Sequence, residues 1–295
     1  IPMKFRIPCA LLCGALVLSL AACGSGAATP TPTVSVPSPS ASQSPDVTPE
    51  PSAEPTTEPT PEPSPEPEFP VYEFGAPLEE SEPVEDSYFD DVVFLGDSRT
   101  EGLQLFGGLA HGTYYWARGM TVFRVDDPKY AVFNVNGTDH TMIGALKQKQ
   151  YKAVYIMVGV NELGYPADSY ETGLAAFVDQ VAEVQPNAVI YLQIMPPIND
   201  ELARKNGLAD YINNTNLAAF NEALIRVAKE KRVVLLNTAE VYTDENGQLQ
   251  ADIAADGCHF TFSGYPRWIE YLRCHVIDAG RYFYYRDLIK EGPEA

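Results

Sequence analysis

Ser98 stands at a point in the chain where a nucleophile would be exposed. It follows an apolar run, residues 92–95, and the tripeptide Gly96-Asp97-Ser98, and a periodic stretch begins at Arg99. An apolar run that ends in glycine predicts a buried strand, and the stretch after it predicts a helix. Ser98 would then lie at the carboxyl edge of a sheet, where open α/β sheets bind their ligands. The alternative is a serine that only caps the helix.

An aspartate and a histidine three residues apart provide the partners that such a serine needs. Asp256 and His259 lie in a segment rich in turn-forming residues. A histidine can accept the serine proton, and an aspartate can orient the histidine. Among the four histidines of the chain, only His259 follows an acid at this spacing in an expected loop. We therefore interpret Ser98, His259 and Asp256 as a nucleophile, its general base and the orienting acid.

Two further positions could stabilise an oxyanion that forms at Ser98. Asn161 follows a second apolar run, residues 153–158, and a neutral amide at a strand end is a suitable donor. Gly119 follows a short expected strand, residues 113–116, and a glycine lets a backbone N–H approach a ligand closely. Purely structural roles in their own loops are the alternatives for both residues.

Taken in this order, the four blocks resemble the SGNH (GDSL-type) hydrolase family. The signatures of that family are a GDS serine, a glycine, a G-x-N-[DE] asparagine and a D-x-x-H pair, which match Ser98, Gly119, Asn161 and the pair Asp256 and His259. Glu162 stands where many members have aspartate. The resemblance implies a Ser-His-Asp esterase whose oxyanion hole is formed by Ser98, Gly119 and Asn161, with no cofactor and no metal.

The remaining chain alternates apolar runs with helical patterns, which predicts an α/β fold with a parallel sheet covered on both faces. The family resemblance makes this a three-layer α/β/α sandwich around a mainly parallel five-stranded sheet, with flavodoxin-like order. An Asn-Gly pair within residues 133–138 predicts a hairpin. Further strands are expected at 188–193 and 233–237, and helices at 170–184, 215–231 and 263–276. Residues 282–289 form either a final helix or a cover for the sheet edge.

The first residues indicate export. Lys4 and Arg6 precede an apolar stretch, residues 10–20, that is too short to span a bilayer. Small residues before Cys23 resemble a bacterial lipobox, which implies cleavage before Cys23 and attachment of lipid to it. An ordinary secretory signal is the alternative. We expect residues 1–22 to be a lipoprotein signal peptide and the protein to be lipid-anchored to the bacterial cell membrane, outside the cytoplasm.

A low-complexity segment follows, in which Thr-Pro, Ser-Pro and Glu-Pro pairs repeat. Such a composition cannot bury enough apolar surface to fold and favours extended polyproline II conformations. We expect residues 23–85 to be a stalk and residues 86–295 to be the hydrolase domain. A proline-rich recognition ligand is the alternative for the stalk.

The chain has a formal net charge of −20, and the stalk contributes a large share of it, since 12 of the 40 acidic side chains lie in residues 24–85. The rest of the chain is also acidic, which disfavours nucleic acid as a partner and disfavours strongly anionic substrates. Cys258 and Cys274 are the cysteines of the expected domain. Either a disulfide or two free thiols is compatible with an oxidising exterior.

The triad and the signal sequence predict an extracytoplasmic serine esterase. The family resemblance and the expected location imply that it hydrolyses O-acyl esters, short ones such as acetyl esters, on small molecules or glycans. The alternatives are an O-acyltransferase with the same triad, or a surface-binding module with a silent site. The loop at residues 195–199 and the region 107–116 are expected to line the substrate cleft.

Overall fold

The predicted strands form a parallel sheet in the computed structural model, which describes residues 72–288. Four of the five strands are buried at every residue, as expected for strands covered on both faces. The strand order is β2-β1-β5-β6-β7, and each neighbouring pair is parallel. The strands are β1 (Val92–Gly96), β2 (Thr113–Trp116), β5 (Ala153–Met157), β6 (Val189–Gln193) and β7 (Val234–Leu236).

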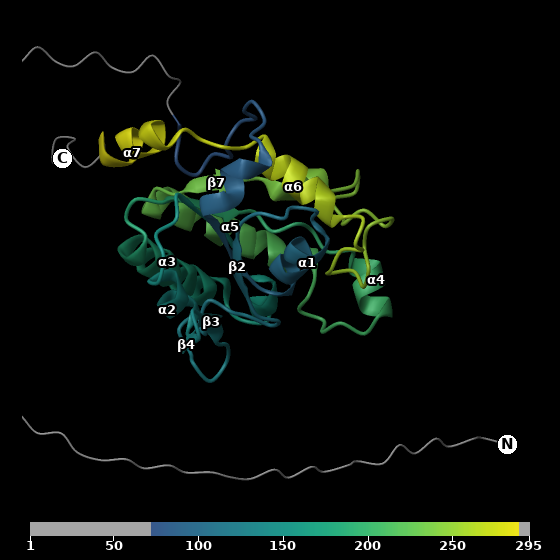
Figure 1. Ribbon diagram of the computed structural model, residues 1–295. Helices are drawn as coiled ribbons and strands as arrows, with labels where there is room; N and C mark the ends of the chain where they lie inside the picture. Colours follow the sequence, from purple (N-terminus) through teal and green to yellow (C-terminus); the bar gives the residue numbers. More distant parts are fainter. Residues whose placement is uncertain (1–71, 289–295) are drawn as a thin grey trace, which may run out of the picture. The chain divides into compact units, whose positions relative to one another are not determined.

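Helices cover this sheet in two layers. Helix α3 packs against α5 and α2, while α1 packs against α6. Figure 1 shows α1 and α6 on one side of the sheet and α2 and α3 on the other, so the predicted three-layer α/β fold is confirmed. The helices are α1 (Ser98–Phe106), α2 (Met142–Leu146), α3 (Ala167–Val184), α4 (Asp200–Lys205), α5 (Asn214–Lys231), α6 (Tyr265–Arg273) and α7 (Ala279–Leu288).

The apolar spacing of the longest helices explains why they pack on the sheet. In α3 the buried side chains recur three or four residues apart, which places them on one helical face. Burying one such side chain stabilises the folded state by about 1.5 to 3 kcal/mol relative to leaving it exposed. The buried residues of α3 are Tyr170, Leu174, Phe177, Val178 and Val181.

The strand order creates a switch point between β1 and β5. The chain passes from β1 outward to β2, and then returns to place β5 on the other side of β1. Loops that leave the carboxyl ends of two such strands diverge and open a crevice, in which α/β proteins bind ligands. Ser98 follows β1 and Asn161 follows β5, so the sheet brings both to this crevice.

The predicted hairpin is also present. Strand β3 (Phe133–Val135) pairs antiparallel with β4 (Thr138–His140). The two connecting residues, Asn136 and Gly137, have φ values of 52° and 84°. Both therefore lie in the left-handed region that a type I′ turn requires, which explains the Asn-Gly pair.

The folded domain begins before the boundary predicted at residue 86, because residues within 72–85 pack against it. Tyr72, Phe74 and Leu78 are buried in the core. The Leu78 N–H donates to the Leu235 carbonyl at 2.8 Å, and the Leu235 N–H donates to the Tyr72 hydroxyl at 2.8 Å. Since β7 is the edge strand, this segment covers an edge that would otherwise be open to pairing. The part of the stalk that the structure describes therefore belongs to the folded domain.

The predicted signal peptide, Cys23 and the stalk up to residue 71 lie outside the described residues. Over residues 72–288, the structure contains no helix that is both long and apolar enough to span a bilayer.

The packing of residues 72–85 leads to a prediction about truncation. A chain that begins at Asp86 should be less stable than one that begins at Tyr72 by about 3 kcal/mol or more, because three buried side chains and the cover of β7 are lost. For a domain of this size, that loss lowers the melting temperature by about 10 °C. Calorimetry of the two truncated proteins measures the difference. Equal melting temperatures would show that the segment adds no stability.

Candidate active site

Ser98 is the first residue of α1, and its neighbour Asp97 caps the helix. The Asp97 carboxylate accepts a hydrogen bond from the Arg99 backbone N–H at 2.8 Å, as an N-cap side chain does. The alternative in which Ser98 caps the helix is therefore wrong, and its hydroxyl is directed to another partner. As the first residue of the helix, Ser98 also has a backbone N–H without an acceptor inside the helix.

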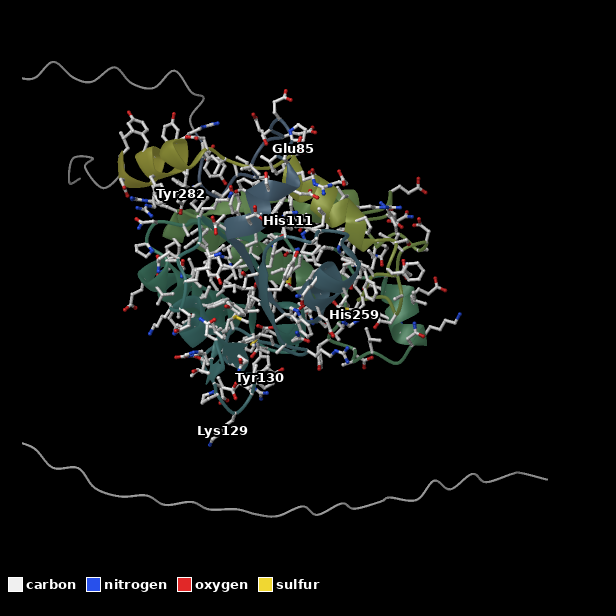
Figure 2. The ribbon with its side chains drawn as sticks, viewed as in Figure 1. Glu85, His111, Lys129, Tyr130, His259 and Tyr282 are labelled. Atoms are coloured by element: carbon white, nitrogen blue, oxygen red, sulfur yellow. The ribbon has the colours of Figure 1, made fainter. Side chains whose placement is uncertain are left out.

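The structure brings Ser98, His259 and Asp256 together. Ser98 Oγ lies 2.8 Å from His259 Nε2, and His259 Nδ1 lies 2.8 Å from Asp256 Oδ2. The second Asp256 oxygen accepts backbone N–H groups from Cys258 and His259, at 2.8 and 2.7 Å. Figure 2 shows His259 beside α1 and α4. The two ring nitrogens of His259 thus connect a carboxylate to a serine hydroxyl.

The environment of Asp256 favours its charged form. Burial opposes ionisation, but the hydrogen bonds from the His259 ring and from the His259 and Cys258 backbones outweigh it and hold the pKa of Asp256 well below its usual value. A carboxylate that stays charged keeps a proton on His259 Nδ1 and leaves Nε2 free to accept one from Ser98.

Arg99 is a site residue that the sequence analysis missed. Its side chain is fully buried, and the guanidinium donates to the Cys258 carbonyl from Nε and Nη2, at 3.2 and 3.0 Å. Nη1 donates to the Pro196 carbonyl at 3.3 Å, and the guanidinium lies 5.8 Å from the centre of the Phe260 ring. Arg99 therefore connects α1, next to Ser98, to the loop that carries His259. Its position next to the serine is the only sequence signal that could have identified it.

The loop after β6 supports the site through the Pro196 carbonyl, which accepts a hydrogen bond from Arg99, and the loop does not line the site. Met195 and Ile198 are buried, as are the two prolines between them. The prediction that residues 195–199 line the cleft is therefore wrong for residues 195–198, because these side chains are buried. Asn199 is half-buried and caps α4, where its side chain accepts the Leu202 N–H. Within the region 107–116, Tyr115 is buried and the Tyr114 ring stacks on the Phe94 ring with centroids 4.7 Å apart, so these two side chains pack against the core.

Gly119 and Asn161 lie on neighbouring loops. Gly119 has φ of 71° in a turn closed by the Met120 N–H and the Ala117 carbonyl. A side chain at Gly119 would be strained, and its Cβ would lie 2.8 Å from the Tyr130 hydroxyl. Asn161 Nδ2 donates to Asp97 Oδ2 at 3.2 Å and to the Met120 carbonyl at 3.0 Å. The amide of Asn161 is thus held between the loop of Gly119 and the residue before Ser98.

Glu162 binds the same two loops together from inside the protein. Its side chain is fully buried, and Oε1 accepts the Val122 N–H at 2.7 Å. The other oxygen has no hydrogen-bond partner. Burial, with a smaller contribution from the nearby Asp97 charge, raises the pKa of Glu162 to about 8. Burial likewise raises the pKa of Asp97.

Cys258 and Cys274 are both free thiols, so the disulfide that the sequence allowed is not observed. Cys258 is buried, and its sulfur lies 3.7 Å from Arg99 Nη2. Among residues 72–288, no group of three or more His, Cys, Asp or Glu side chains is arranged to hold a metal ion.

The raised pKa of Glu162 predicts a pH-dependent effect on stability. Folded Glu162 keeps its proton up to pH about 8, whereas the unfolded chain releases it near 4.5. Between these values the unfolded state binds fewer protons, so this group makes the protein less stable as pH rises. Glu162→Gln has no proton to release. Its free energy of unfolding relative to wild type should therefore increase by on the order of 3 kcal/mol from pH 5 to pH 8.

Urea unfolding of wild type and Glu162→Gln at the two pH values measures this change, with the exposed Glu183→Gln in α3 as the matched control. A difference between wild type and Glu162→Gln that stays constant with pH would show that Glu162 is ionised in the folded protein.

Comparison with known proteins gives a family match over the region described above. The model of the GDSL-like Lipase/Acylhydrolase family matches residues 94–267. No curated protein matches the chain.

Several solved structures are similar in fold. A GDSL-like lipase from Bacteroides thetaiotaomicron VPI-5482 is 18% identical, with a TM-score of 0.45 over 65% of this chain and 88% of the other. The psychrotrophic esterase EstA from Pseudoalteromonas sp. is 15% identical, with a TM-score of 0.41 over 62% and 94%. A protein from Streptococcus pneumonia that is described as a platelet activating factor is 24% identical, with a TM-score of 0.49 over 62% of this chain and 81% of the other.

The family match spans more than half of the chain and contains all four sequence blocks, from the Gly96-Asp97-Ser98 tripeptide to the Asp256 and His259 pair. The chain therefore belongs to the GDSL-like lipase/acylhydrolase family, which is a family of ester hydrolases.

Proposed function

We propose that the protein is a serine esterase in which Ser98 attacks the carbonyl carbon of an ester. The observation that carries this proposal is the chain of two 2.8 Å hydrogen bonds that joins Ser98 to His259 and His259 to Asp256. His259 Nε2 accepts the Ser98 proton as the new C–O bond forms. It then gives this proton to the alcohol oxygen when the ester C–O bond breaks. Asp256 stabilises the imidazolium between these two steps.

A second half-reaction restores the serine. Water attacks the acyl group on Ser98 while His259 accepts a proton from the water. The Ser98–acyl bond then breaks, and His259 returns the proton to Ser98 Oγ. The products are a carboxylic acid and an alcohol.

Three donors are proposed for the oxyanion: the backbone N–H groups of Ser98 and Gly119, and the side-chain amide of Asn161. The position of Ser98 at the start of α1 supports its role, since helix N-termini attract negative charge. The Asn161 amide already donates to Asp97 and to the Met120 carbonyl. The bond to Asp97 is the longer of the two, at 3.2 Å, and is the one with which a substrate oxyanion would compete.

Arg99 is proposed as a positioning residue for His259. It acts through the Cys258 carbonyl, which directly precedes His259, and so sets the distance between the imidazole and Ser98. The fork of the guanidinium reaches two carbonyls on different loops, which a lysine ammonium cannot do in the same geometry.

The substrate and the location are also proposals. We propose a short acyl group, such as acetyl, from the family resemblance. We propose a mature protein that begins at Cys23 and is held by lipid at the outer face of the cell membrane, from the signal sequence and its small residues. This location favours an acylated glycan as the substrate. The apolar side chains of α1 beside Ser98 instead favour an ester of an apolar alcohol.

The first test is Ser98→Ala. Loss of the nucleophile should lower kcat for a soluble ester by about 10⁴-fold or more, by analogy with other serine hydrolases. The change removes one half-buried hydroxyl and should leave the free energy of unfolding within about 1 kcal/mol of wild type. Hydrolysis of p-nitrophenyl acetate measures the rate, and Ser169→Ala on α3 is the matched control. Turnover close to wild type in Ser98→Ala would refute the assignment.

Arg99→Lys tests the positioning role. Loss of the forked contact should let the His259 loop shift, and a shift of about 1 Å at a catalytic group can lower kcat about 100-fold. We expect kcat to fall by about 10- to 100-fold while KM changes little, because Arg99 does not reach the surface that contacts substrate.

Steady-state kinetics and the pH profile of kcat are measured together for Arg99→Lys. A displaced imidazole should also move the acidic limb of the profile, which a general loss of stability would not do. Wild-type kcat with an unchanged profile would leave Arg99 a purely structural residue.

Cys23→Ser tests the anchor. Membrane retention in the native host should depend on Cys23, while hydrolysis of soluble esters should not, because the site residues lie between Asp97 and His259, more than 70 residues after Cys23. Mass spectrometry of the mature amino terminus from isolated membranes is the decisive measurement, and a diacylglyceryl-modified Cys23 is expected. An unmodified terminus at another residue would indicate an ordinary secreted enzyme.

A further inference from the structure

A groove of about 410 Å³ opens at Ser98 and His259 and follows one face of α1. Ser98, Gly102, Leu105 and Phe106 are spaced along this face by helical periodicity, so they form a single stripe. The eight residue steps from Ser98 to Phe106 rise about 12 Å along the helix axis. We propose, on the basis of the serine esterase function above, that this groove binds the alcohol portion of the substrate and that this alcohol is apolar.

The walls of the groove are apolar beyond the catalytic groups. Leu105 and Phe106 are large side chains that remain 59% and 48% exposed, and adjacent exposed apolar side chains that line a groove are typical of a ligand-binding surface. The Phe106 ring contacts the Tyr265 ring of α6, with centroids 5.9 Å apart. An alkyl or aryl group that lies on these residues would be removed from water on one side.

The floor of the groove depends on Gly102. A Cβ at this position would lie 2.0 Å from Cζ of Tyr265, so the Tyr265 ring lies almost directly on the helix backbone. Gly102 and the Tyr265 ring therefore lie in contact where both line the groove.

The charged residues of the groove neutralise each other. Arg118 donates to both carboxylate oxygens of Glu101, at 2.6 and 2.7 Å. Such a bidentate pair presents no net charge to a ligand. The groove therefore offers no free cation for an anionic headgroup and no free carboxylate for a cationic one, which favours an uncharged occupant.

The position of His259 decides which part of the ester lies here. The leaving oxygen must be within hydrogen-bond reach of His259 Nε2, because His259 donates the proton to it. The proposed oxyanion donors Gly119 and Asn161 come from the loops after β2 and β5. His259 lines the groove, whereas neither Gly119 nor Asn161 does, and Arg118 is the one lining residue from the loop of Gly119. The groove therefore lies on the side of the leaving oxygen, and we assign it to the alcohol.

Two ester series test this assignment. In the first series the acyl group is acetyl and the alcohol is ethanol, butanol, hexanol or octanol. In the second series the alcohol is ethanol and the acyl group grows from acetyl to octanoyl. Partial burial of each added methylene in the groove should raise kcat/KM by about twofold in the alcohol series. From ethyl to octyl acetate the rise should exceed tenfold, and it should exceed the rise in the acyl series.

Leu105→Ser combined with Phe106→Ser should flatten the alcohol series, so that the ratio of kcat/KM for octyl and ethyl acetate falls at least tenfold. Both positions are exposed, so the protein should fold. Val132→Ser removes an equally exposed apolar side chain before β3, away from the groove, and should keep the wild-type ratio.

A flat alcohol series, a steeper rise in the acyl series, or a higher kcat/KM for acetylated xylan than for hexyl acetate would overturn the inference. In each of these cases hydrolysis that depends on Ser98 would preserve the proposed function. Hydrolysis of all esters at the same rate by wild type and Ser98→Ala would instead overturn both.

Discussion

The site depends on one interaction across the chain, the contact of the buried Arg99 guanidinium with the Cys258 carbonyl. Ser98 and His259 are 161 residues apart in sequence, yet their side chains must meet within hydrogen-bond distance. Of these two residues the sheet positions only Ser98, since His259 lies in a loop that follows no strand directly. Arg99, adjacent to the serine, attaches that loop to α1. Because a buried cation without hydrogen-bond partners is costly, the loop and the helix hold each other in place.

The other half of the site is built on two buried carboxyl groups. Asp97 caps α1 and accepts from the Asn161 amide, while Glu162 accepts the Val122 N–H. Burying these groups is unfavourable, and for Glu162 the result is a carboxyl that holds its proton up to about pH 8. In return, the loops after β2 and β5 are tied to the start of α1. This arrangement lowers stability and connects the loops that carry the proposed oxyanion donors to the start of α1.

The sequence predicted the features that depend on local patterns. Short apolar runs identified the strands, and the residues at their carboxyl ends identified Ser98 and Asn161, because a parallel sheet brings those ends to one edge. Features that depend on tertiary contacts were missed. In the sequence, Arg99 cannot be distinguished from an exposed arginine on a helix. The buried segment around Tyr72 directly follows a proline-rich stalk, and the composition of the stalk gives no sign that a folded segment begins there. The prediction that the loop at residues 195–199 lines the cleft failed for residues 195–198, because proline content does not reveal burial.

The most direct measurement of the central claim is the site at which a phosphorylating ester reacts. The protein is incubated with diethyl p-nitrophenyl phosphate, and its peptides are analysed by mass spectrometry. The account predicts one diethylphosphoryl group per chain, on Ser98, with release of one p-nitrophenolate, and a reaction that is slower by orders of magnitude in His259→Ala. Modification of a residue other than Ser98, or an equal rate in His259→Ala, would contradict it.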